Sequence, residues 1–250
     1  MRSVFRAVAL PAGATKALSV SCPRGYFALS AGASRAGEGI RELEARPLSP
    51  RTFAFRLANT GDLDQRVTVA AACRRIRAAG AKSPYLKLAS RKRVMVRVAP
   101  PSLRQARITC PSGTVPAASG FDLGRRRELN VREETQDLHV LTFGVFNAGS
   151  TSRAVSFFAG CLTVVRPAGG RGAQLQVSLA TDTVPVHVGT QVVTRLCPQG
   201  WLTLAAGYSV PAGVELNGAA AVGRTGRWTL TNPAQKPVLA ELQLACARVA

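Results

Sequence analysis

The residues of this chain that could do chemistry are six cysteines, two histidines and a few close carboxylates. The histidines, His139 and His187, each stand between apolar residues in segments of strand-like alternation. A Ser-His-Asp triad or a histidine-based metal site needs its histidine beside further polar partners. We therefore expect both histidines to lie on sheet faces rather than to act as bases.

Two carboxylate pairs, Glu133-Glu134 and Glu42 with Glu44, have spacings that could serve as an acid and a base. No sequence feature typical of a binding pocket accompanies these pairs, so we expect their carboxylates to be solvated charges on strands or loops. The glycine-rich run 169–172 lacks the Lys-Ser/Thr of a phosphate-binding loop, and no C-x-x-C or Cys/His cluster is present. The sequence thus predicts no enzyme, no metal and no cofactor.

The cysteines instead mark an internal repeat. Alternate cysteines recur at intervals of about 87 residues, and the separations within successive pairs are 51, 51 and 49. The six positions are Cys22, Cys73, Cys110, Cys161, Cys197 and Cys246.

Other residues keep the same register. Each odd cysteine opens a C-P-x-G turn, and a second glycine follows ten residues after it, at Gly32, Gly120 and Gly207. An asparagine stands 14 residues before each closing cysteine, at Asn59, Asn147 and Asn232. Because asparagine tolerates the backbone of hairpin turns, we expect a structural role for these three.

The repeat favours one disulfide pattern, in which the two cysteines of each unit pair with each other. Six cysteines allow about 15 connectivities, and sequence alone does not exclude the others. Reduced, buried cysteines that pack as small apolar residues are the alternative. A bridge that closes a loop of this length stabilises a unit by roughly 3–4 kcal/mol in the chain-entropy model.

The periodicity is that of strands, with apolar and polar residues in alternation between Gly, Pro and Asn turns. The first unit predicts strands near 4–10, 15–22, 26–31, 40–46, 52–58 and 65–73, with a short one near 74–78. The fold class expected is all-β, with three tandem disulfide-closed β-sandwiches of about 85 residues over 1–80, 91–167 and 174–250. A single pseudo-threefold β-prism with one shared core is the alternative. The segments 74–93 and 166–176 read as linkers.

The chain is strongly basic, with 33 Lys and Arg against 13 Asp and Glu and a net charge of +20. Residues 1–90 carry 15 basic and 5 acidic side chains, 91–170 carry 12 and 5, and 171–250 carry 6 and 3. This asymmetry predicts that the N-terminal part faces an acidic surface. The candidate partner-binding residues are Arg74, Arg75, Arg77, Arg91, Lys92, Arg93, Arg125, Arg126 and Arg127.

Nucleic acid is a less favoured partner. The sequence has no DNA-binding motif, and only 6% of its residues are aromatic. The arginines alternate along strands instead of standing with aromatic residues, as base stacking would require. No apolar run is long enough for a membrane-spanning helix. We therefore expect neither a nucleic-acid partner nor a membrane.

With its bridged, tandem immunoglobulin-like units, the chain resembles the outer-capsid decoration proteins of tailed phages. The likeness lies in the architecture and in the Cys22–Cys73 type of spacing. It implies a non-enzymatic virion-surface protein, a cement, decoration, spike or tail component, that docks through its basic N-terminal part. The expected partner is a major capsid protein or another virion protein, and self-association is left open.

The first 21 residues lack the apolar stretch of an export signal, while the cysteines favour an oxidising location. A virion-surface protein is made in the cytosol and is exposed only when the host cell lyses. Such a protein needs no export signal and can still form disulfides. The alternative is a secreted adhesin or carbohydrate-binding module of a bacterial cell surface, whose signal is removed before numbering.

Overall fold

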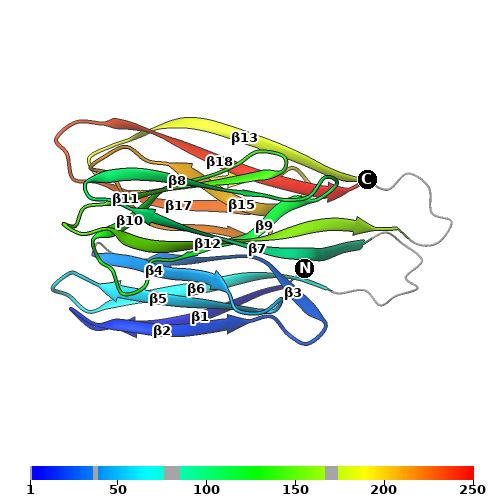
Figure 1. Ribbon diagram of the computed structural model, residues 1–250, viewed down its shortest axis with the longest axis horizontal. Coiled ribbons are helices and arrows are strands. Elements are labelled where there is room, and N and C mark those ends of the chain that lie inside the picture. The colour runs from blue at the N-terminus through cyan, green and yellow to red at the C-terminus, as the bar shows by residue number, and fades with distance from the viewer. Residues whose placement is uncertain (1, 36–38, 76–84, 167–173) are drawn as a thin grey trace.

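The computed structural model describes residues 2–35, 39–75, 85–166 and 174–250. Its described residues form eighteen strands and no helix, and the strands follow the long axis of the molecule (Figure 1). None of the described segments is a helix of the length and apolarity that crossing a membrane requires. The strands are β1 Arg2–Leu10, β2 Thr15–Ser21, β3 Tyr26–Arg35, β4 Ile40–Pro47, β5 Thr52–Asn59, β6 Gln65–Arg75, β7 Tyr85–Val98, β8 Ser102–Thr109, β9 Val115–Asp122, β10 Leu129–Gln136, β11 Val140–Asn147, β12 Arg153–Val165, β13 Leu175–Val186, β14 Gly189–Leu196, β15 Leu202–Ser209, β16 Glu215–Val222, β17 Thr225–Asn232 and β18 Val238–Val249.

The all-β class is confirmed, and the six long strands expected in the first unit coincide with β1 to β6 within a few residues. The short strand expected near 74–78 overlaps the end of β6 and otherwise lies outside the described residues. Each repeat contributes six strands. Its first, third and sixth strands belong to one sheet, and its second, fourth and fifth belong to another.

The predicted disulfides are present, and they join these two groups of strands. Cys22 directly follows β2 and bonds to Cys73 in β6 with Cα atoms 5.6 Å apart. Cys110–Cys161 and Cys197–Cys246 repeat the relationship after β8 and β14. All six cysteines are oxidised, so the alternative of reduced cysteines is wrong.

The tandem arrangement is wrong, because sheets run from one repeat into the next. The described residues form four sheets, of which two have six strands: β2-β5-β4-β9-β12-β7 and β13-β18-β15-β10-β11-β8. The first, which we call sheet B, joins repeat one to repeat two by pairing β4 with β9. The second joins repeat two to repeat three by pairing β10 with β15. The three-stranded sheets β1-β6-β3 and β14-β17-β16 complete the set.

The repeats meet in cyclic order. β16 of the third repeat lies against β3 of the first, where the Ser30 hydroxyl donates to the carbonyl oxygen of Ala221 over 2.6 Å. The fourth strand of each repeat therefore contacts the third strand of the next, and the last repeat returns to the first.

The glycine repeated ten residues after each odd cysteine explains these junctions. A β-carbon on Gly32, Gly120 or Gly207 would overlap the carbonyl oxygen of Ala219, Ala45 or Glu134, respectively, in the adjoining repeat. Only glycine lets the two backbones approach so closely.

The hydrophobic core is shared as well. One cluster includes Leu10, Phe143 and Trp228, one from each repeat, and a smaller cluster includes Phe27, Val115 and Leu204. A shared interior is the property that the prism alternative requires, although the described residues form four sheets.

One of the expected unit boundaries, residue 91, lies inside β7, so part of the expected linker 74–93 is a strand. The boundaries at 80 and 167 lie outside the described residues.

Candidate functional site

The structure places the predicted cations on separate elements. Arg74 and Arg75 end β6, the run 91–93 lies within β7, and the run 125–127 lies in the loop between β9 and β10. Arg77 lies outside the described residues. Arg127 donates to the carbonyl oxygen of Gly13 and the hydroxyl of Thr15, so it holds the β1–β2 turn.

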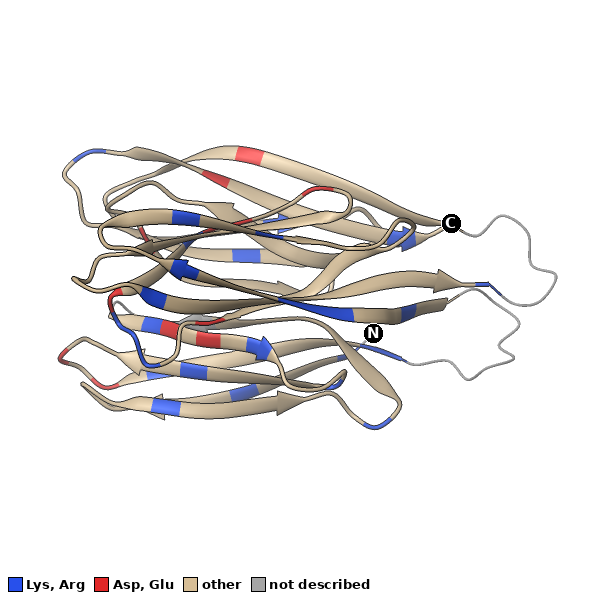
Figure 2. Cartoon of the chain, in the orientation of Figure 1, with Lys and Arg blue, Asp and Glu red and all other residues tan. Residues whose placement is uncertain are grey.

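One of these clusters forms a groove. Arg91, Lys92 and Arg93 are exposed and, together with Pro47, Phe158 and Ala159, line a depression of about 240 Å³ on sheet B. In the strand register Phe158 on β12 pairs with Arg93 on β7. We call this depression the basic groove. Figure 2 shows blue segments along β7, the strand that carries its three cations.

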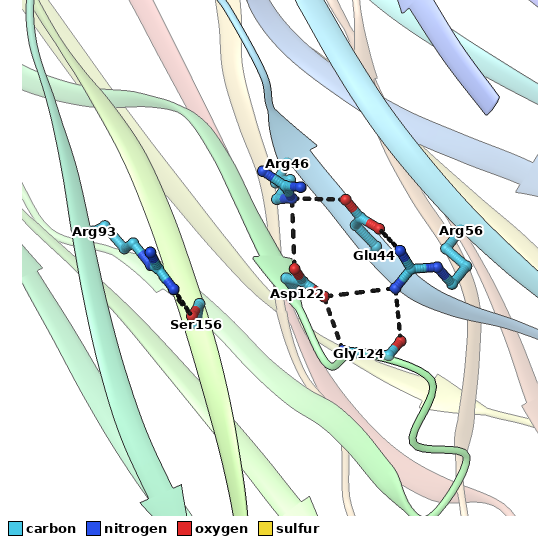
Figure 3. A network of polar contacts seen from close by, with 7 residues as sticks. All are labelled: Glu44, Arg46, Arg56, Arg93, Asp122, Gly124 and Ser156. Carbon is cyan, nitrogen blue, oxygen red and sulfur yellow. Dashed lines mark hydrogen bonds and ion pairs between the residues drawn. The ribbon is translucent and has the colours of Figure 1, made fainter. Parts of the chain in front are cut away.

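An aromatic ring holds one cation of the basic groove, Arg93, next to a neighbouring arginine outside it, Arg46. The guanidinium carbons of Arg46 and Arg93 lie 5.8 Å and 5.7 Å from the centre of the Phe158 ring. The Arg93 guanidinium also donates to the Ser156 hydroxyl over 3.0 Å (Figure 3). Cations over an aromatic face gain electrostatic attraction and are held in place. The expectation that the arginines stand apart from aromatic residues is therefore wrong.

A carboxylate network balances part of this charge at the β4–β9 junction. The Glu44 carboxylate binds Arg46 over 2.6 Å and Arg56 over 2.8 Å, and Asp122 from the second repeat lies 3.5 Å from Arg46 (Figure 3). The Glu44 side chain is only 4% exposed. The expectation that Glu44 is a solvated charge is wrong, because its carboxylate is buried and holds Arg46 and Arg56, which in turn contact Asp122 of the second repeat.

The cations on β7 are not balanced in this way. Among the described residues, no ion pair involves Arg91, Lys92 or Arg93. Arg91 makes a 3.4 Å contact with the carbonyl oxygen of Leu48, which is neutral. The basic groove thus presents three uncompensated positive charges to solvent at one edge of sheet B.

A second feature is a cavity of about 90 Å³ lined by the third and fourth strands of all three repeats. Glu42, Glu134 and Glu215 line it, one from each repeat, together with Arg41. Burial raises the pKa of Glu134 to about 7, a hydrogen bond with Ser119 opposes this, and the Glu42 carboxylate adds to it. Because Glu134 lines this cavity and is only partly exposed, it is not the solvated charge that the sequence predicts.

Neither histidine occupies a strand, so that expectation is wrong. His139 and His187 lie in the turns after β10 and β13. The Nδ1 atom of His139 lies 2.6 Å from the carbonyl oxygen of Thr114. Within the described part of the chain, no group of three His, Cys, Asp or Glu residues could hold a metal ion.

The three repeated asparagines are structural, as the sequence predicts. Asn147 is fully buried; its Nδ2 donates to the carbonyl oxygens of Val98 and Thr151, and its Oδ1 accepts from the amide of Gly149. Asn59 and Asn232 make the equivalent three bonds in their repeats. Each asparagine thereby fixes its turn to the end of the first strand of its repeat, which is β1, β7 or β13.

Sequence reasoning missed Pro47, Arg46 and Phe158 as partners of the run 91–93. They lie 44 or more residues away from that run in the sequence, and strand pairing alone brings them to it. One local feature of the sequence points to Phe158: in the alternation of β12 it occupies an outward-facing position, like Ser156, where a polar residue is expected.

Comparison with known proteins adds no assignment. No protein-family model matches the chain, and no curated protein matches it significantly.

Proposed function

We propose that this protein is a non-enzymatic docking protein that attaches through the basic groove to an acidic surface of a protein partner. The observation that carries the proposal is the uncompensated trio Arg91, Lys92 and Arg93 beside Phe158. Planar guanidinium groups that are held in place match carboxylates well and lose little side-chain freedom on binding.

The three disulfides and the shared core suit such a role, because a stiff body loses little entropy when it docks. A capsid shell is the acidic surface that we propose, with the protein exposed on the virion as a cement or decoration subunit. The oxidised cysteines support a location outside the reducing cytosol.

The alternative, a secreted adhesin or carbohydrate-binding module, is a weaker proposal. Sugar-binding sites commonly use aromatic rings that are open to stack on, yet Trp228 is fully buried. Arg248 lies 4.8 Å from the ring centre of Trp201 and covers it. Both tryptophans of the chain are thus engaged within the protein.

The test compares two variants of equal charge. Replacing Arg91, Lys92 and Arg93 by Gln removes three positive charges from the basic groove, and replacing the exposed Arg66, Arg107 and Arg227 by Gln removes three from elsewhere. Retention on immobilised polyglutamate is measured at increasing salt. We expect only the groove variant to elute at markedly lower salt; equal elution of the two variants contradicts the proposal.

A deletion of residues 1–80 is not suitable for this test, since it removes half of sheet B. Point substitutions on exposed side chains leave the strand pairing in place. Duplex DNA serves as the competing surface. If the full chain binds DNA more tightly than polyglutamate, and loses that binding in the groove variant, the partner is a nucleic acid and the proposal is wrong.

A further inference from the structure

The strand that carries the basic groove is also an edge strand. β7 is the last strand of sheet B, and within the described residues its only hydrogen-bonded neighbour is β12. The next strand in the chain, β8, belongs to the other six-stranded sheet. One row of β7 backbone groups therefore lacks a strand partner, which is the requirement for pairing with an added strand.

The charge of β7 sets it apart from its equivalents. β7 has five basic residues among 14 and no acidic one, whereas β1 has two basic residues and β13 has none and carries Asp182. An edge strand of this charge repels the β7 of a second copy and disfavours apolar strands. The strand that it selects is an acidic one.

The register defines the pattern that a partner strand needs. Arg91, Arg93, Met95 and Arg97 pair with alternate residues of β12 and share the outer face of sheet B with Phe158. The pairing with β12 shifts at Leu88/Ser90, so the regular stretch runs from there to Val98. All four of these side chains are exposed, and Met95 is 66% exposed.

We propose that β7 accepts an extended acidic segment of the partner protein as an added strand. In this added segment every second side chain faces the same side as the β7 arginines. Acidic residues lie opposite Arg91, Arg93 and Arg97, and an apolar residue lies opposite Met95. This inference rests on the proposed function, because it specifies how the acidic partner reaches the β7 cations of the basic groove: along the free edge of β7, opposite its β12 neighbour. Opposite charges directly across two strands stabilise the pairing, and the backbone hydrogen bonds supply affinity.

The test uses three peptides of about ten residues, a length that matches a usual strand. The first alternates Glu with Thr and has one Leu at the Met95 position. The second has the same composition with its Glu residues consecutive. The third is the first peptide with N-methyl groups on alternate amides, which block strand pairing. Affinity for the full-length oxidised protein is measured by fluorescence anisotropy, and amide exchange in β7 is measured with and without peptide.

We expect the alternating peptide to bind at least about tenfold more tightly than its rearranged isomer and to slow amide exchange in β7. We expect N-methylation to abolish that gain. If both Glu peptides bind equally and lose affinity in the groove variant, the docking function stands and strand addition is wrong. If none binds, or if the groove variant binds like the matched control, both proposals are wrong.

Discussion

Gly120 on β9 lies so close to Ala45 on β4 that a β-carbon at position 120 would overlap the Ala45 carbonyl oxygen. This contact joins the first repeat to the second, and Gly32 and Gly207 make the equivalent contacts at the other two junctions. The spacing of these glycines from the cysteines therefore reflects the way in which the repeats assemble.

Gly120→Ala should destabilise the protein by about 1–3 kcal/mol, the usual cost of overpacking a tight contact. Urea unfolding followed by tryptophan fluorescence measures the free energy of unfolding. Because the overlap is with a backbone atom, which a side-chain movement cannot relieve, we expect amide protection in β4 and β9 to fall as well.

Gly25→Ala is the control for Gly120→Ala. Gly25 has a φ of 82° and no atom near its would-be β-carbon, so its cost of roughly 1 kcal/mol comes from backbone strain alone. Loss of β4 and β9 protection in this variant too would contradict the role of Gly120 at the junction.

The stability of the protein should depend on the protonation of Glu134. Its pKa is about 7 in the folded protein against an ordinary value of 4.5, so the folded state binds this proton more tightly. The resulting stabilisation is complete below pH 4.5 and is lost as pH rises through 7, with an upper bound of about 3 kcal/mol. Glu134→Gln should remove this pH dependence from melting curves.

Glu241→Gln is the matched control for Glu134→Gln, because Glu241 is exposed on β18. We expect its melting temperature to fall between pH 5 and 8 as in the parent protein. A Glu134→Gln variant that keeps the parent's full pH dependence would show that another group is responsible.

Removal of one disulfide should weaken the whole molecule. Replacing Cys110 and Cys161 by Ala opens a loop with a sequence separation of 51, and the chain-entropy model gives a loss of about 4 kcal/mol. Because the core is shared by all three repeats, calorimetry should show one transition shifted to lower temperature.

Separate transitions, one of them shifted, would instead indicate independently folding units and contradict the shared core. Thiol labelling under denaturing conditions provides the accompanying check on the bridges. Since the structure has no free cysteine, alkylation should label the six thiols only after reduction.

Glu44→Gln should cost about 2–3 kcal/mol, because it removes the nearer of the two carboxylates that Arg46 and Arg56 share at a junction between repeats and leaves only the more distant Asp122. The estimate lies below that for a fully buried pair, since the two arginines are 31% and 25% exposed. Thermal unfolding measures the change.

Asp182→Asn provides the comparison for Glu44→Gln. It removes the exposed ion pair with Arg195, in which both side chains are more than 40% exposed, and should change stability by less than about 1 kcal/mol. Equal effects of the two substitutions would show that the Glu44 network contributes no more than a surface pair.

Much of the fold was open to prediction from local features. The alternation of apolar residues located β1 to β6, and the cysteine register predicted the three bridges. The strand predictions succeed because periodicity and turn residues depend only on neighbours in the sequence. The disulfide prediction succeeds because a triplicated pattern shows the same pairing three times. The same logic identified Asn59, Asn147 and Asn232 as turn residues.

The sequence by itself therefore determined the strands, the bridges and the basic character of β7. Only the tertiary structure decided that the repeats share sheets and a core, that Glu134 lies in a cavity, and that Phe158 and Arg46 join Arg93. The physical reason is that pairing β4 with β9 and β10 with β15 depends on backbone contacts between residues roughly 75 apart in the chain. Hydrogen-bonding groups of the backbone are the same in every residue, so apart from the three junction glycines a strand's choice of partner leaves little trace in its side chains.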